Sequence, residues 1–191
     1  MSDFQSNERL RSLMEQMFKL RKDMRDALAE SATRDVEDYP FTTTDGPVRL
    51  SDLFGGKTDL FLIHNMGKGC TYCTLWADGF NGVYPHLADR ARFVVSSPDS
   101  PAVQKAFAES RGWRFPMVSQ EGTTFAADLG LGGEDENSVY PGVSVFQLKD
   151  GKIRRVSATP FGPGDEFCPV WQFLDLLPEG ANGWEPKMTY A

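Results

Sequence analysis

The sequence predicts an α/β fold in which a mixed central sheet is flanked by helices and preceded by an N-terminal amphipathic helix. Two observations predict this class: short apolar runs alternate with segments of helical periodicity, and the last two strands form a hairpin rather than a crossover. The chain has 191 residues, is 40% apolar and contains no Pro/Gly/Ser-rich linker, so it is long enough for one full core. We therefore expect an amphipathic helix within residues 1–35 and one domain over residues 36–191.

The centre of the predicted sheet is the segment 58–65, whose run Leu60–Ile63 is apolar without interruption. Such a run is typical of a strand that is covered on both faces, as in a mostly parallel sheet. Further strands are predicted at 91–96, 115–119, 143–148 and 153–158. The last two flank the turn Lys149–Lys152 and therefore predict an antiparallel hairpin.

Helices are predicted between these strands from apolar residues at helical spacing. Their expected ranges are 70–87, 101–111, 123–129 and 165–177, the last one capped by Asp165. Two short extended pieces around the turn Thr44–Pro47 and a helical turn at 51–54 are expected before the central strand. Residues 132–137 are acidic and glycine-rich, which predicts a loop.

The predicted N-terminal helix runs from about Ser6 to Ala32 and has an apolar stripe at nearly heptad spacing. The stripe consists of Leu10, Leu13, Met17, Leu20, Met24 and Leu28. It either packs on the chain's own domain or forms the interface of a homodimer. An independent coiled coil is less favoured, because the pattern has fewer than four clean heptads.

Charge and composition limit the partners. The formal net charge is −7 and the pI is about 4.9, which argues against nucleic acid or an anionic membrane surface. No apolar stretch approaches the roughly 18 residues of a spanning helix, and the chain opens with polar and acidic residues rather than a signal peptide. Three cysteines do not suit a secreted disulfide framework. We therefore expect a cytoplasmic protein with a cytosolic dithiol.

The expected chemistry lies at Cys70 and Cys73, where the central strand gives way to a helix. Cysteines three apart in a first helical turn share one face, so their sulfurs can join without backbone movement. The helix dipole contributes about 0.3–1 kcal/mol, less than the ~1.4 kcal/mol that one pKa unit represents, so Lys68 or a hydrogen bond from the Cys73 thiol is needed as well. Greater exposure favours Cys70 as the attacking group. A CxxC that opens the first crossover helix predicts a thioredoxin-like fold.

Five stretches carry a resemblance to a known family: CTYCTLWADGFNG, FVVSSPD, RGWRFPMVS, PGVSVF and FGPGDEFCPVW…LDLLPEG. They resemble a bacterial family of thioredoxin-like proteins, largely uncharacterised, that is related to the alkyl hydroperoxide reductase and thiol-specific antioxidant group. The resemblance covers roughly residues 30–190. It implies a thioredoxin fold and dithiol–disulfide exchange, and its motif assigns that role to Cys70 and Cys73.

Two better-known relatives differ from this sequence near the dithiol. A peroxiredoxin has Thr or Ser three residues before its peroxidatic cysteine and Pro four residues before that, whereas this chain has Gly67 and Ile63 there. Thioredoxin has Trp before its first cysteine and Gly-Pro between the two, whereas this chain has Gly69 and Thr71-Tyr72. The sequence therefore lacks the hydroxyl that activates the cysteine of a peroxiredoxin. The redox potential of thioredoxin does not carry over to this chain either.

Pro141 is the candidate for the substrate groove. Thioredoxins have a cis-proline opposite the dithiol, at the start of the strand that opens the hairpin, and Pro141 has a similar offset. A cis bond occurs in about 5–6% of X-Pro pairs in folded proteins. The resemblance implies a cis bond at Tyr140–Pro141 about as strongly as the position favours an ordinary trans proline at a strand entry.

Other residues have a structural and a chemical interpretation. Cys70-x2-Cys73-x12-His86 matches three zinc-finger ligands by spacing, but the fourth ligand is missing, so no metal is expected. His64 ends the central strand and is interpreted as a structural histidine, with proton transfer to the leaving thiolate as the alternative. Cys168 is expected to be buried, with a resolving or regulatory role as the alternative.

The helix after the dithiol carries Trp76, Asp78 and Phe80. Packing is the expected role of the two aromatic residues, and the sequence assigns none to Asp78. The sequence as a whole predicts a thiol–disulfide oxidoreductase that acts on a disulfide-containing protein or a small thiol and needs no organic cofactor. The alternatives are a non-enzymatic association protein of the same fold and, less favoured, an atypical thiol peroxidase.

Overall fold

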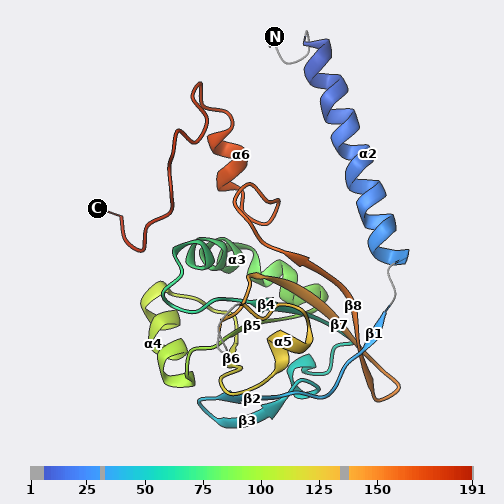
Figure 1. Ribbon diagram of the computed structural model, residues 1–191, viewed down its shortest axis with the longest axis vertical. Helices are drawn as coiled ribbons and strands as arrows, with labels where there is room; N and C mark the ends of the chain where they lie inside the picture. The colour runs from blue at the N-terminus through green and yellow to red at the C-terminus, as the bar shows by residue number, and fades with distance from the viewer. Residues whose placement is uncertain (1–6, 31–32, 134–137, 191) are drawn as a thin grey trace.

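The computed structural model describes residues 7–30, 33–133 and 138–190 (Figure 1). Residues 134–137 of the predicted acidic loop lie outside this range. In chain order the elements are α2 (Glu8–Glu30), β1 (Arg34–Asp35), β2 (Pro40–Thr43), β3 (Gly46–Arg49), the 3-10 turn η1 (Asp52–Phe54), β4 (Asp59–His64), α3 (Thr71–Arg90), β5 (Arg92–Ser97), α4 (Pro101–Arg111), β6 (Met117–Ser119), α5 (Phe125–Asp128), β7 (Gly142–Lys149), β8 (Lys152–Pro160) and α6 (Val170–Leu174).

A single mixed sheet organises the fold, with strand order β1-β8-β7-β4-β5-β6-β2-β3. β4 lies at its centre, parallel to β5 and antiparallel to β7, so that Ile63 is paired with Val95 on one side and Val143 on the other. The hairpin β7–β8 turns at Asp150 and Gly151, which both have positive φ. The predicted α/β class with a mixed sheet is confirmed.

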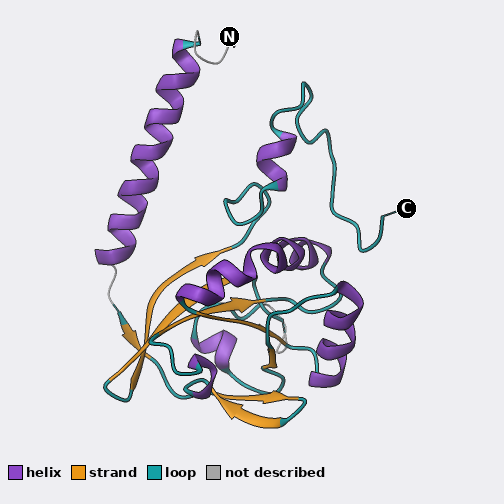
Figure 2. Cartoon of the chain, turned by 180° about the vertical axis from the view of Figure 1, so that it is seen from behind, coloured by secondary structure: helices purple, strands orange, loops and turns teal. Residues whose placement is uncertain are grey.

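The two faces of the sheet form two separate cores because alternate residues of β4 point in opposite directions. Leu60 and Leu62 join a cluster with Phe125 of α5. Phe61 and Ile63 join the other cluster, which is built on α3. Figure 2 shows α3 and α4 on one side of the strands and the short α5 on the other. The expectation that the central strand is covered on both faces is confirmed.

The last helix is much shorter than the predicted range 165–177. Asp165 does not cap it; the Asp165 carboxylate accepts the backbone N–H groups of Gly162 and Phe167 in a turn. Pro169 is the physical reason: it disfavours helical backbone at the residue before it and is tolerated only at the start of a helix. α6 therefore begins directly after Pro169, at Val170.

The N-terminal helix α2 forms as expected, but none of its residues is buried. It leads away from the sheet edge (Figure 1), and after it Arg34–Asp35 pair with β8 as a short edge strand. No helix among the described residues is long and apolar enough to span a membrane.

Candidate functional site

The loop between β4 and α3 is held in a fixed shape by two hydrogen bonds. The Gly67 N–H donates to Asn65 Oδ1 at 2.8 Å, and the Lys68 N–H donates to Asp99 Oδ2 at 2.7 Å. Gly67 has φ +100°, and a Cβ atom there would lie 2.9 Å from Asp99 Oδ2. Both the backbone conformation and the neighbouring carboxylate therefore make a side chain at Gly67 unfavourable.

Cys70 is the N-cap residue of α3, and Cys73 lies in the first turn. The Cys73 N–H donates to Cys70 Sγ at 3.1 Å, as an N-cap side chain usually accepts from the third helical residue. The Met66 N–H donates to Cys73 Sγ at 3.4 Å. Cys70 is half-buried whereas Cys73 is 3% exposed, so the structure places the predicted attacking sulfur nearer to solvent and the second sulfur behind it.

The two thiols have opposite pKa shifts. A hydrogen bond from the Cys73 thiol lowers the pKa of Cys70 from 9.0 to about 6, assisted by the backbone N–H groups of Cys73 and Tyr72 and opposed by burial. The same hydrogen bond, together with burial, raises the pKa of Cys73. At neutral pH the site therefore holds one thiolate at Cys70 and one thiol at Cys73, the pair that a nucleophile and its resolving group require.

Lys68, the other group expected to stabilise the thiolate, is not among the causes of the Cys70 shift. Its backbone serves the loop through Asp99 instead. The residue that sequence reasoning missed is Met66, whose sulfur lies 3.9 Å from Cys70 Sγ and whose side chain is 45% exposed. Met66 therefore forms part of the surface that a molecule approaching Cys70 meets first.

His64 lies on the opposite face of the sheet from the dithiol. Its ring stacks on Phe125 with centroids 5.4 Å apart, and Nε2 is 2.9 Å from Ser144 Oγ. Burial lowers the pKa of His64 to about 3, with a smaller effect from Arg155. The structure thus favours the structural interpretation of His64, because a neutral buried ring on the far face does not serve a leaving thiolate.

The block that follows the dithiol ties α3 to the C-terminal segment and to the end of α4. Trp76 Nε1 donates to Asp165 at 3.3 Å. Asp78, which the sequence left without a role, accepts from Trp113 Nε1 at 2.8 Å and forms an ion pair with Arg111. The Asp78 carboxylate raises the pKa of Arg111. Phe80 is buried, as expected.

The C-terminal segment also reaches the dithiol turn. Tyr72, between the two cysteines, stacks on Trp171 with centroids 6.2 Å apart, and Trp171 in turn contacts Trp184. Cys168 is buried in the same core cluster as Cys73. Burial raises the pKa of Cys168, which agrees with its expected structural role.

Pro141 directly precedes β7, and the register His64–Gly142 places it at the edge of the sheet where β4 ends and the dithiol loop begins. The Tyr140–Pro141 bond is trans, so the cis geometry implied by the resemblance is wrong here. The Pro141 carbonyl accepts the N–H of Phe161, which is the arrangement of an ordinary strand-entry proline. Within the described ranges, no group of three or more His, Cys, Asp or Glu residues is arranged to hold a metal.

Residues 7–190 match DUF899, a bacterial protein family of unknown function. No curated protein matches the chain. Among solved structures, the peroxidoxin BcpB of Mycobacterium tuberculosis is 26% identical with a TM-score of 0.57, over 66% of this chain and 83% of that one. Peroxiredoxin Q of Xanthomonas campestris (18% identity, TM-score 0.55, 64% and 80% covered) and AhpC of Enterococcus faecalis (19%, 0.55, 70% and 82%) have the same fold.

Proposed function

Because the chain belongs to DUF899, a family of unknown function with the thioredoxin-like fold of the peroxiredoxins, we propose its function from the site: a thiol–disulfide oxidoreductase with Cys70 as nucleophile and Cys73 as resolving thiol. One observation supports this most strongly. Cys70 Sγ receives the Cys73 N–H at 3.1 Å and the Cys73 thiol, which lower its pKa to about 6. About nine-tenths of Cys70 is then thiolate at pH 7.

The reaction proceeds in two exchange steps. The Cys70 thiolate attacks one sulfur of a substrate disulfide, a Cys70–substrate disulfide forms, and the other substrate sulfur leaves as a thiolate that takes a proton from water. Cys73 then loses its proton and attacks Cys70 Sγ, which releases the second substrate thiolate and leaves a Cys70–Cys73 disulfide. Two electrons pass to the substrate, and an external dithiol must return them.

The surface beside Cys70 that a substrate would meet includes the apolar side chain of Met66. Met66 is exposed beside Cys70, and Pro141 lies on the neighbouring strand entry. A disulfide-containing protein or a small disulfide fits this setting, since neither Met66 nor Pro141 demands a charged ligand. We place the protein in the cytoplasm, where a dithiol stays reduced.

A thiol peroxidase is the second candidate, because the similar solved structures are peroxiredoxins. In that reaction the Cys70 thiolate takes one oxygen of a hydroperoxide, giving a sulfenic acid and an alkoxide, and Cys73 condenses with the sulfenic acid to form the disulfide and water. Gly67 argues against it. A hydroxyl-bearing side chain at that position would require positive φ and would collide with Asp99.

The two reactions are separated by measuring disulfide reduction and peroxide consumption with the same purified protein. We expect disulfide reduction to exceed peroxide consumption, Cys70→Ser to abolish the activity, and Cys73→Ser to accumulate a mixed disulfide visible by mass spectrometry. Cys168→Ala serves as the matched control and should keep the wild-type rate within about twofold, because Cys168 is buried.

Three outcomes would contradict the proposal. Activity that survives Cys70→Ser would remove its nucleophile, and a dithiol that is not oxidised and reduced reversibly would remove the enzyme and favour a non-enzymatic association protein. A peroxide rate well above the disulfide rate would establish the peroxidase instead.

A further inference from the structure

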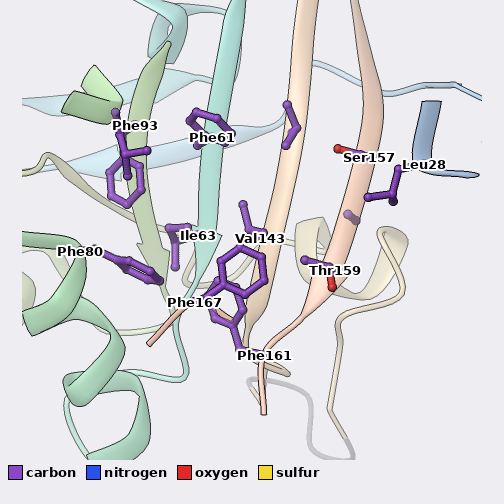
Figure 3. A pocket seen from close by; sticks show the side chains of 13 residues that line it. Leu28, Phe61, Ile63, Phe80, Phe93, Val143, Ser157, Thr159, Phe161 and Phe167 are labelled. Atoms are coloured by element: carbon purple, nitrogen blue, oxygen red, sulfur yellow. The ribbon is translucent and has the colours of Figure 1, made fainter. Parts of the chain in front are cut away.

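An apolar groove lies on the α3 face of the sheet and is separate from the dithiol. It encloses about 240 Å³. Figure 3 shows its walls, which include Phe61 and Ile63 of β4, Phe80 of α3 and Val143 of β7. On this face α3 covers β5 and α4 covers β6. The groove lies beside them, over β7 and β8. A sheet face of this composition is normally covered by a helix.

The chain also has an apolar helix face that lacks a cover. Leu13, Met17, Leu20 and Met24 of α2 are 46–60% exposed, and no residue of the helix is buried. A helix gains most of its stability in a protein from packing an apolar stripe rather than from intrinsic propensity. The unpacked stripe and the uncovered groove are therefore complementary features of one sequence.

Among the described residues of one copy, Leu28 is the residue of the stripe that lines the groove. This residue of the last turn of α2 lines the rim of the groove opposite Phe167 (Figure 3). The strand β1 then fixes the base of the helix, because Arg34 pairs with Arg155 of β8. Figures 1 and 2 both show α2 leading away from the sheet beyond that base. Most of the stripe therefore points to a surface outside its own domain.

Charge identifies the occupant of the groove. The segment 165–185 contributes Phe167 to the groove, and every charged side chain in it is acidic: Asp165, Glu166, Asp175, Glu179 and Glu185. In contrast, α2 carries six basic residues (Arg9, Arg11, Lys19, Arg21, Lys22 and Arg25) against five acidic ones (Glu8, Glu15, Asp23, Asp26 and Glu30), so its formal charge is +1 in a chain of net charge −7. Arg21 already contacts Glu166 at 3.1 Å. The segment thus attracts this helix rather than an anionic partner.

We propose that two copies of the chain form a homodimer in which α2 of each copy packs its stripe into the groove of the other. Each copy provides one helix and one groove, so a two-fold arrangement satisfies both and closes the assembly. The proposal concerns the sheet face and α2, and it does not depend on the activity of the dithiol.

The test is the mass of the full-length protein at micromolar concentration, measured by size-exclusion chromatography with light scattering. We expect twice the chain mass of 21.3 kDa. Met17→Glu on the stripe and Ser157→Glu in the groove should each weaken the dimer about 30-fold or more, the effect of a central interface residue. Ser12→Glu adds the same charge on the opposite face of α2 and should leave the dimer intact.

Mixing the two weakened variants sharpens the result. A reciprocal exchange predicts a heterodimer from Met17→Glu and Ser157→Glu, because one unaltered helix then meets one unaltered groove. Circular dichroism establishes that both variants are folded. A monomeric wild type, or a dimer that survives Met17→Glu, would overturn the proposal. A dimer broken by Met17→Glu but not by Ser157→Glu would also overturn it and indicate pairing of α2 with α2.

Discussion

His64 is the last residue of β4, and Cys70 follows it by six residues at the start of α3. Each has a lowered pKa, yet the two shifts have opposite chemical meanings. The pKa of His64 falls to about 3 because burial disfavours its charged form. The pKa of Cys70 falls to about 6 because hydrogen-bond donors stabilise its charged form, even though burial opposes them. A lowered pKa thus makes one group inert and the other reactive.

The difference comes from which side of the sheet each residue enters. His64 turns into the core cluster of Phe125, where Nδ1 is buried without a hydrogen-bond partner among the described residues. Cys70 lies beyond the strand end, at the cap of α3, where the N–H groups of the first turn point at its sulfur. Hydrogen-bond donors to the charged form, rather than the depth of burial, therefore distinguish the reactive side chain from the inert one.

The largest expected effect concerns the burial of His64. Between pH 7 and pH 5 the unfolded chain protonates His64 near 6.5 while the folded chain does not, so stability falls as pH decreases, by about 2 kcal/mol from this residue. The variant His64→Gln does not titrate and should lose about 2 kcal/mol less over the same interval. Urea unfolding at the two pH values measures the difference. Equal pH dependence in both proteins would mean that His64 is not held neutral.

The next effect concerns the donor at Cys70. Cys73→Ala removes the thiol hydrogen bond to the thiolate, and a hydrogen bond to a charged group is worth about 1.5–3 kcal/mol, or about one to two pKa units. Alkylation of Cys70 by iodoacetamide at pH 6 should therefore slow about tenfold. Cys73→Ser keeps a hydroxyl donor and should slow it less. A Cys73→Ala rate equal to that of the wild type would show that the side chain at residue 73 does not stabilise the thiolate.

The smallest effect is expected at Cys168, where burial outweighs the hydrogen bond from the Val170 N–H. Burial raises the pKa of Cys168, so it should stay unreactive at pH 8. In the variant Cys70→Ser/Cys73→Ser, a thiol reagent should modify Cys168 only after denaturant is added. Rapid labelling of the native variant would contradict the distinction between buried and donor-held sulfurs.

The sequence predicted the elements whose pattern is local. The apolar run Leu60–Ile63 and the hairpin around Gly151 are decided by neighbouring residues, and both formed as expected. The final helix was predicted too long because the effect of Pro169 on the preceding backbone was not weighed against the apolar periodicity.

The candidate site was predicted at its cysteines but not in its surroundings. Asp99, Arg111 and Trp171 reach the dithiol region from distant parts of the chain, and only the folded sheet brings them there. The pKa of Cys70 likewise depends on the distance to the Cys73 N–H, which spacing suggests but does not fix. The stripe of α2 was readable in the sequence, but the groove that we propose as its partner was not, because several strands assemble it.

The reduction potential of the Cys70–Cys73 couple as a function of pH tests the central claim most directly. If Cys70 ionises near pH 6, reduction takes up two protons below that pH and one above it. The potential should then fall by about 59 mV per pH unit below pH 6 and by about 30 mV per unit from pH 6 to 8. A single slope of about 59 mV up to pH 8, or the lack of a reversible couple in the wild-type protein, would contradict the account.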